Sequence, residues 1–248
     1  MAALGLLVVA LVPRWQLAGE VPASQPQWAL RAQWFWQALE SGALHDTYIA
    51  PHPGLTVMWY AGAAQHLGAD ATRLGRVVAS SRASAVVAAL LILLAVWLVR
   101  RILTLDRNDE AGAIAVLFGL LLALDPLSIQ MTGLIGLDGP VALMILVAFL
   151  TIVLHLREGR RTTLWIAGLA TGLAVATKVP GLLLLPLPFV LWLGEPRADR
   201  PSGRWVWSTF AVLVAGAVVV IWVLLPAAWA DPLRIGKDLL VGKGPRDE

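Results

Sequence analysis

The chain has no cysteine and few charged residues. Without Cys among its 248 residues, disulfide bonds and thiolate metal sites are excluded, which removes zinc-finger and thiol-redox proteins from consideration. Charged residues make up 14% of the chain, against roughly 25% in soluble domains, whereas 58% of residues are apolar and the mean hydropathy is +0.75. The composition indicates an integral membrane protein. The small excess of Lys and Arg suits membrane edges, so nucleic acid is not an expected partner.

Seven apolar runs predict an all-α, polytopic membrane domain of about seven transmembrane helices over residues 1–248. A helical pass needs about 20 residues to cross the hydrocarbon. The run at residues 2–12 has no basic residue before it, so we interpret it as a first helix whose start is missing; the alternative is the apolar core of a signal peptide. The runs of sufficient length, followed by the shorter ones, lie at 84–103, 137–156 and 205–225, and at 111–124, 164–177 and 182–193.

Arginine in the short joints predicts the orientation of these helices, because basic residues in short loops stay in the cytoplasm. The joint at 125–139 has no Lys or Arg, so it is expected to face outward. We therefore expect 14–83 to be a long extracytoplasmic loop of a multi-pass protein in the inner or plasma membrane. Nine Arg residues occupy the alternate joints: Arg100, Arg101, Arg107, Arg157, Arg160, Arg161, Arg197, Arg200 and Arg204.

The stretch 164–193 fits two short passes broken at Pro180-Gly181 better than one tilted helix. A single pass would move the following Arg residues to the outer side, against the charge rule. With this parity one membrane face collects the chain's candidate polar residues, and we expect the functional site there, facing the extracytoplasmic side. These residues are Asp46, His52, Asp125, Asp138, Lys178 and Asp231.

The expected outer loop contains an amphipathic segment and a constrained histidine. Apolar residues of 27–40 share one helical stripe, which predicts a juxtamembrane helix that ends near Ser41-Gly42. Further on, Pro51 and Pro53 flank His52 and hold it out of any helix. Such a His is a candidate acid, base or phosphate donor; the alternative is a turn residue that only forms a hydrogen bond.

Several motifs, in order along the chain, resemble one enzyme family. Residues 35–42, Thr47-Tyr48 and 52–59 resemble the first outer loop of bacterial GT-C membrane glycosyltransferases (family 39-like) related to protein O-mannosyltransferases and the lipid A aminoarabinose transferase. The later matches are Leu124-Asp125-Pro126 with Leu137-Asp138-Gly139, the glycine-rich segment 168–181 that contains Thr177-Lys178, and Asp231-Pro232 after Trp229. The resemblance covers nearly all of the chain but only the N-terminal half of a typical member, which implies a truncated chain.

The resemblance implies transfer of a sugar from a polyprenyl-phosphate carrier to an acceptor on the outer side of the membrane, with inversion. Membrane lipids and this donor lipid are the implied partners. The chemistry needs a carboxylate to accept the acceptor's proton and a cationic or hydrogen-bonding group to stabilise the departing phosphate. Both requirements direct attention to helix ends at headgroup level.

The chain departs from the family pattern in its first two outer loops. Ser24-Gln25 stand where the family carries an Asp-Glu pair, so the usual catalytic base is missing, although Glu20 and Asp46 are nearby carboxylates. Thr132-Gly133 occupy the place of a Ser-Arg-like pair, which removes an expected phosphate-binding cation.

Asp138 and His52 are therefore the candidate catalytic residues, and Lys178, Asp125, Tyr48 and Trp28 are candidates for binding substrate. Each has a plainer alternative. Asp138 could simply favour the N-terminus of a helix, Asp125 before Pro126 is typical of a turn, and Lys178 could reach toward the headgroups. The spacing Gly168-x-x-x-Gly172 predicts a close helix-packing face.

Two other functions remain open alongside the glycosyltransferase. One is a catalytically inert lipid-binding or assembly protein that kept the fold after losing the acidic pair. The other is a small transporter, against which the long spans carry no ionisable residue at mid-helix. No metal-ligand spacing occurs, so a divalent cation would need ligands from separate loops, and the sequence assigns no metal site.

Overall fold

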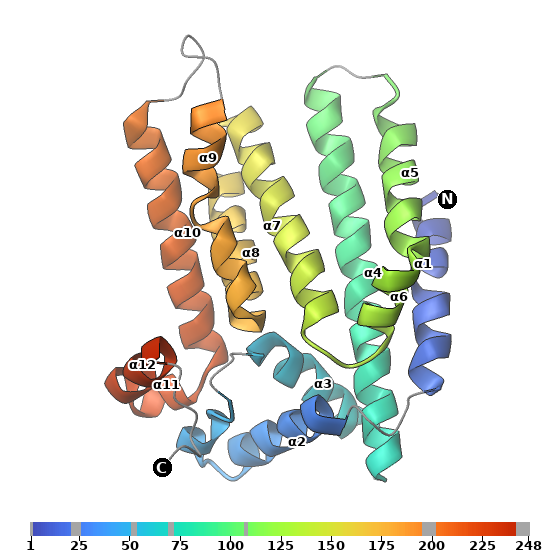
Figure 1. Cartoon of the computed structure of the whole chain (residues 1–248), viewed down its shortest axis with the longest axis vertical. Helices are drawn as coiled ribbons and strands as arrows, with labels where there is room; N and C mark the ends of the chain where they lie inside the picture. The colour runs from blue at the N-terminus through green and yellow to red at the C-terminus, as the bar shows by residue number, and fades with distance from the viewer. Residues whose placement is uncertain are drawn as a thin grey trace.

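In the computed structural model, residues 2–20, 26–50, 54–68, 72–106, 109–194 and 202–241 are described; these ranges form helices and no strand (Figure 1). The all-α prediction is confirmed. In chain order, with η marking 3₁₀ helices, the elements are α1 (Ala2–Gly19), α2 (Pro26–Glu40), η1 (Leu44–Thr47), α3 (Leu55–Leu67), α4 (Arg73–Leu105), α5 (Ala111–Leu124), α6 (Pro126–Gly133), α7 (Asp138–Glu158), α8 (Arg161–Thr177), η2 (Val179–Leu184), α9 (Leu187–Gly194), α10 (Gly203–Leu224), α11 (Ala227–Ala230) and α12 (Pro232–Val241).

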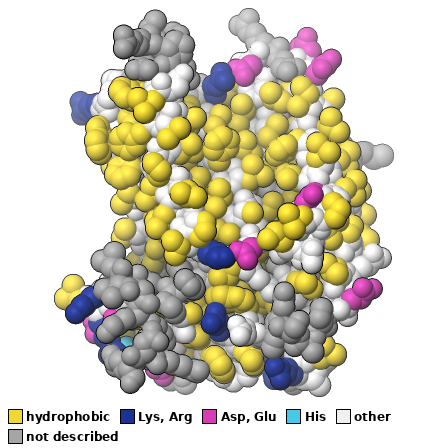
Figure 2. All heavy atoms as spheres, viewed as in Figure 1, with side chains coloured by type: hydrophobic (Ala, Val, Ile, Leu, Met, Phe, Trp, Pro, Cys, Tyr) yellow, Lys and Arg dark blue, Asp and Glu magenta, His cyan; other side chains and the backbone are white. Residues whose placement is uncertain are grey.

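Within the described ranges, four helices, α1, α4, α7 and α10, are long and apolar enough to cross a membrane, and the bent pair α5–α6 brings the number to as many as five. Hydrophobic side chains cover the middle of the bundle surface, as expected of a lipid-facing band (Figure 2). The protein is therefore a multi-pass membrane protein. The expected short passes at 164–177 and 182–193 correspond to α8, of 17 residues, and α9, of 8 residues.

Two helices extend further than expected toward the long loop. α1 continues beyond residue 12 to Gly19, and α4 begins at Arg73 rather than at Ser84. The segment between them is consequently shorter than the expected loop 14–83. It contains the amphipathic helix predicted for 27–40, which the structure shows as α2, and Gly42 follows this helix with a left-handed φ of 73°.

The bundle has two polar ends. The C-terminal ends of α4 and α7 lie at the upper end in Figure 1. There Arg101 contacts Glu158 at 2.8 Å and Arg157 contacts Asp106 at 3.1 Å. The lower end is covered by α2, η1, α3, α11 and α12, which lie across the ends of the long helices (Figure 1). We refer to this end as the lower end; it contains the candidate residues Asp138 and Lys178.

α8 and α10 pack closely through glycines. A Cβ added to Gly172 would lie 2.5 Å from the carbonyl oxygen of Gly216, and one added to Gly216 would lie 2.2 Å from that of Gly168. Only residues without a side chain allow this approach. The prediction that Gly168 and Gly172 form a packing face is confirmed.

The chain reverses direction directly after α8. Lys178 is extended, with φ −161° and ψ 149°, and the 3₁₀ helix η2 begins at the next residue with Pro180 in its first turn. η2 folds back onto α8, since a Cβ on Gly181 would lie 2.5 Å from backbone atoms of Ala174 and Val175. The predicted break at Pro180-Gly181 is confirmed, and Lys178 is placed at the turn.

A buried arginine holds the bend of 62° between α5 and α6. Pro126 has no N–H, so the C-terminal carbonyls of α5 lose partners that a continuous helix would supply. Arg14 of α1 donates to the carbonyl oxygens of Ala123 and Leu122 at 2.8 and 3.2 Å and is fully buried. Expected at the start of a polar loop, Arg14 instead lies inside a helix, because helix ends that lack water need a donor from within the protein.

Candidate functional site

The centre of the candidate site is an ion pair between Asp138 and Lys178. Asp138 is in the first turn of α7, where a negative charge is favoured by the helix dipole, and Lys178 follows the last residue of α8. Lys178 Nζ donates a hydrogen bond to Asp138 Oδ1. The two residues are 40 positions apart in the chain. The side chain of Asp138 remains 60% exposed and that of Lys178 33% exposed. The structure thus brings together two of the six predicted site residues in a position open to a ligand.

Thr177 connects this pair to the start of α3. Its backbone carbonyl accepts a hydrogen bond from Gly54 N at 3.1 Å, and its hydroxyl lies 2.6 Å from that of Thr56. Thr177 and Thr56 are both buried. The segment just before α3 is therefore tied to the residue next to Lys178.

Trp28 covers the same junction from α2. A Cβ on Gly54 would lie 2.4 Å from Trp28 Cζ3, so the indole ring rests directly on Gly54. Gly54 has φ 51°, a left-handed conformation that also favours glycine. Arg31 lies over the Trp28 ring, with its guanidinium carbon 4.5 Å from the ring centroid. Trp28 is thus close to the end of the segment that carries His52.

His52 lies outside the described residues, as do Pro51, Pro53 and the Ser24-Gln25 positions. Its nearest described neighbours in the chain are Ala50 and Gly54, and only the latter is fixed to Thr177 by a backbone hydrogen bond. The predicted role of His52 stays a prediction.

Tyr48 and Asp125 lie in different surroundings from the Asp138–Lys178 pair. Tyr48 is 4% exposed and packs in a cluster with Phe35, Leu55 and Ala176. Asp125 is the N-cap of α6, since its Oδ2 accepts a hydrogen bond from Ser128 N at 2.6 Å. Among the described contacts none joins Asp125 to Asp138 or Lys178. Its role as the N-cap of α6 therefore accounts for this residue without a role in substrate binding.

Arg14 has a role in this region that the sequence alone did not predict. Its Nε donates to Thr132 Oγ1 at 2.7 Å and its Nη2 to Ser128 Oγ at 2.8 Å, both on α6. Thr132 in turn lies against the start of α7, because a Cβ on Gly139 would be 2.6 Å from its Cγ2. The signal in the sequence was an Arg directly after an apolar run, but its partners are more than 100 residues away and only the fold reveals them.

The arrangement offers one carboxylate, one ammonium group and an aromatic surface at the same membrane edge. Among the described residues no group of three or more His, Asp or Glu side chains could hold a metal ion. What the pair can do chemically is accept a proton through Asp138 and neutralise an anion through Lys178. This combination, at the end of a helical membrane bundle, suits chemistry on a lipid-linked anion.

Comparison with known proteins identifies the family. The model of the dolichyl-phosphate-mannose-protein mannosyltransferase family matches residues 45–231, which is more than half of the chain. No curated protein and no solved structure matches the chain. The chain therefore belongs to this family, as its motifs predicted, and is a membrane glycosyltransferase of the GT-C type. The matched range contains Asp138, Lys178, Tyr48 and Asp125 and leaves out Trp28.

Proposed function

We propose that the protein transfers a sugar from a polyprenyl-phosphate donor to an acceptor hydroxyl at the extracytoplasmic side of the membrane. The observation that carries this proposal is the contact between Lys178 and Asp138 at the lower end of the bundle. The orientation rests on the Arg-rich joints, and three of their described members, Arg101, Arg157 and Arg160, form ion pairs at the opposite end.

The ion pair provides a way to couple donor binding to activation of the base. The donor's phosphate is an anion that competes with the Asp138 carboxylate for the Lys178 ammonium group. Once Lys178 turns to the phosphate, the carboxylate is released and can accept a proton. Proton abstraction by Asp138 would therefore be confined to the protein with donor bound.

The proposed transfer step is a displacement with inversion. The acceptor oxygen forms a bond to the anomeric carbon from the side opposite the phosphate, while the bond from that carbon to the phosphate oxygen breaks. The acceptor's proton passes to Asp138, and Lys178 stabilises the charge that develops on the departing polyprenyl phosphate. His52, from the segment attached at Gly54, is the candidate for a second hydrogen bond to this phosphate.

The test is transfer of labelled mannose from a polyprenyl-phosphate donor by the protein in lipid nanodiscs. Asp138→Asn should lower the rate by about 100-fold or more, the range expected for a lost general base. Lys178→Met should lower it by a similar factor through loss of phosphate stabilisation. Asp106→Asn is the matched control, because Asp106 forms the comparable ion pair with Arg157 at the upper end, and its rate should match the unmodified protein.

A second candidate function is supported by the same contact. A carboxylate already held by Lys178, in a chain with Ser24-Gln25 instead of an acidic pair, also suits a protein that binds polyprenyl phosphate without turnover. Donor binding without transfer in the unmodified protein, lost in Lys178→Met but kept in Asp138→Asn, would favour this function. Equal transfer rates in all three proteins would contradict the site assignment itself.

A further inference from the structure

A cavity of about 580 Å³ opens between the C-terminal half of α2 and η1. Ala38 and Tyr48, which are 7% and 4% exposed, form its buried side. The polar side chains around it come from Gln37, Ser41, His45 and Asp46, and Trp34 contributes an indole ring. The volume is within the roughly 300–1,000 Å³ typical of small-molecule sites.

The lining defines the charge of a suitable ligand. Its described residues include one carboxylate, that of Asp46, and neither Lys nor Arg. An anionic ligand such as a phosphate or a carboxylate would be repelled by Asp46, because the described lining has no permanent cation. His45, whose Nδ1 lies 3.8 Å from Asp46 Oδ1, compensates this charge only when it is protonated. The cavity therefore differs in kind from the Lys178 region, which suits an anion.

The lining also defines the polarity of the ligand. The Asp46 carboxylate accepts hydrogen bonds, and the Gln37 amide can donate and accept. The Ser41 hydroxyl donates to Ala38 O at 3.1 Å and can accept a hydrogen bond from a ligand. Such groups match a molecule with several hydroxyls, each of which is a donor and an acceptor. The Trp34 side chain, 39% exposed, adds a flat apolar surface of the kind that packs against the C–H face of a sugar ring.

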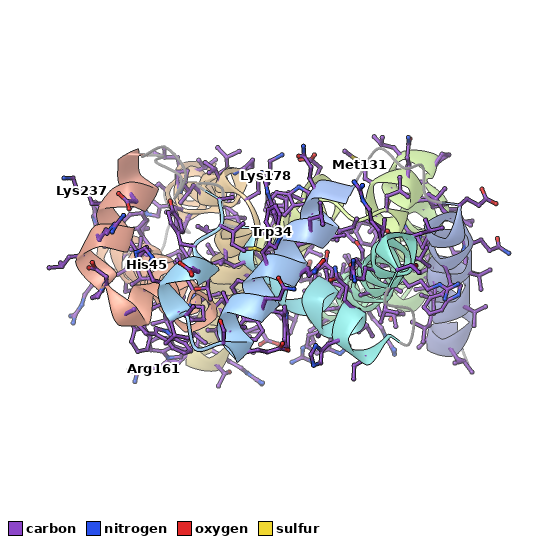
Figure 3. The ribbon with its side chains drawn as sticks, turned by 90° about the horizontal axis from the view of Figure 1, so that it is seen from below. Trp34, His45, Met131, Arg161, Lys178 and Lys237 are labelled. Carbon is purple, nitrogen blue, oxygen red and sulfur yellow. The ribbon has the colours of Figure 1, made fainter. Side chains whose placement is uncertain are left out.

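The walls of the cavity are held in place before any ligand binds. Thr47 Oγ1 accepts a hydrogen bond from Ala227 N at 2.8 Å, which fixes η1 to α11, and the Thr47 hydroxyl donates to Leu44 O at 2.7 Å. Tyr48 packs beside Leu55 and Ala176 in the same cluster. In the view from below, Trp34 lies on α2 and His45 lies toward the C-terminal helix α12 (Figure 3). A preformed site loses less entropy on binding.

We propose that this cavity binds a neutral saccharide. The inference goes beyond the proposed function, because the cavity is lined by neither Asp138 nor Lys178. Binding itself does not depend on the donor or on the Asp138–Lys178 pair.

The experiment measures saccharide binding by saturation-transfer NMR, with the full chain in lipid nanodiscs. Maltoside and glucoside detergents are avoided throughout purification because their headgroups are themselves saccharides. The probes are methyl mannoside, maltose and mannose 6-phosphate. We expect both neutral sugars to bind, and mannose 6-phosphate to bind about tenfold more weakly than methyl mannoside because of its charge, a difference of about 1.4 kcal/mol.

Substitutions in the cavity should weaken binding of the neutral sugars selectively. Trp34→Ala and Asp46→Asn should each lower the affinity by about fivefold or more, and Asp46→Asn should also reduce the discrimination against mannose 6-phosphate. Trp97→Ala is the matched control for Trp34, because Trp97 is 56% exposed on α4. Asp106→Asn is the control for Asp46, because Asp106 pairs with Arg157 at the opposite end of the bundle. Thermal unfolding of each variant shows whether it is folded.

The proposal is overturned if neither neutral sugar binds at tens of millimolar, if mannose 6-phosphate binds as tightly as methyl mannoside, or if the folded Trp34 and Asp46 variants bind as well as the controls. Sugar transfer with no saccharide binding at this cavity would reject the cavity alone. Saccharide binding at the cavity without transfer would reject the proposed enzymatic function alone.

Discussion

Arg14 donates a hydrogen bond to Thr132 across 118 positions of sequence. The same guanidinium group caps the carbonyl ends of α5 at Leu122 and Ala123. One side chain of α1 therefore fixes both helices of the α5–α6 bend. Thr132 in turn contacts Gly139 at the start of α7, next to Asp138.

Replacement of Arg14 by Met should destabilise the protein. Two buried carbonyls of α5 would lose their donors, and each such loss costs about 1–3 kcal/mol. Arg14→Lys should be intermediate, because one ammonium group cannot reach both α5 and α6 as the planar guanidinium does. Thermal unfolding in nanodiscs measures both, with Arg73→Met as the control at an exposed Arg of α4. Equal midpoints for Arg14→Met and Arg73→Met would contradict the capping role.

Replacement of Gly172 by Val should separate α8 from α10. The added side chain meets the carbonyl oxygen of Gly216, and overpacking of this kind costs about 1–3 kcal/mol. Gly112→Ala in α5 is the control, because nothing lies within 4 Å of its added Cβ. Alanine there should leave stability unchanged or raise it by up to about 1 kcal/mol. The two variants are compared by unfolding in mixed micelles.

The hydroxyls of Thr56 and Thr177 should be energetically coupled. A double-mutant cycle with Thr56→Val and Thr177→Val isolates their contact, and hydrogen bonds between membrane helices average about 0.6 kcal/mol by this method. Thr56→Ser keeps the hydroxyl and should keep most of the coupling. If the two Val substitutions are strictly additive, the contact at 2.6 Å contributes nothing to stability.

Tyr60 should make stability depend on pH above about 10. Burial raises the pKa of its phenol above the ordinary value, so the unfolded chain loses this proton at a lower pH than the folded protein does. The stability is complete below pH 10 and falls as the pH rises further. The measurement is the unfolding free energy of the unmodified protein and of Tyr60→Phe between pH 8 and about 11. A decline of equal slope in both would exclude Tyr60 as the cause.

Features that depend on local sequence were predictable. The apolar runs gave the helices, Pro180 with Gly181 gave the reversal after α8, and Asp138 was correctly expected to open a helix. Each of these follows from rules that act within a few residues, such as the missing N–H of proline or the preference of an acid for a helix N-terminus.

Features that depend on tertiary partners were not predictable. The expected topology placed Lys178 and Asp138 on the same membrane face, but no residue near Lys178 in the sequence indicated that the two would form an ion pair. Similarly, no residue near Arg14 indicated that it would bind the carbonyls of α5. The polar cavity beside Tyr48 also depends on the approach of η1 to α2, which a helical pattern does not reveal. In each case the energetic reason for the residue lies in a contact between distant segments.

The partnership of Arg14 with Ala123 also constrains biogenesis. The two residues are 109 positions apart, so α1 leaves the ribosome long before its acceptor carbonyls have been made. Until α5 arrives, a lone guanidinium would have to cross hydrocarbon without a partner, which is costly. α1 should therefore stay at the lipid–water boundary and reach its final depth only when α5 and α6 join it, so that its insertion is completed by helices made later.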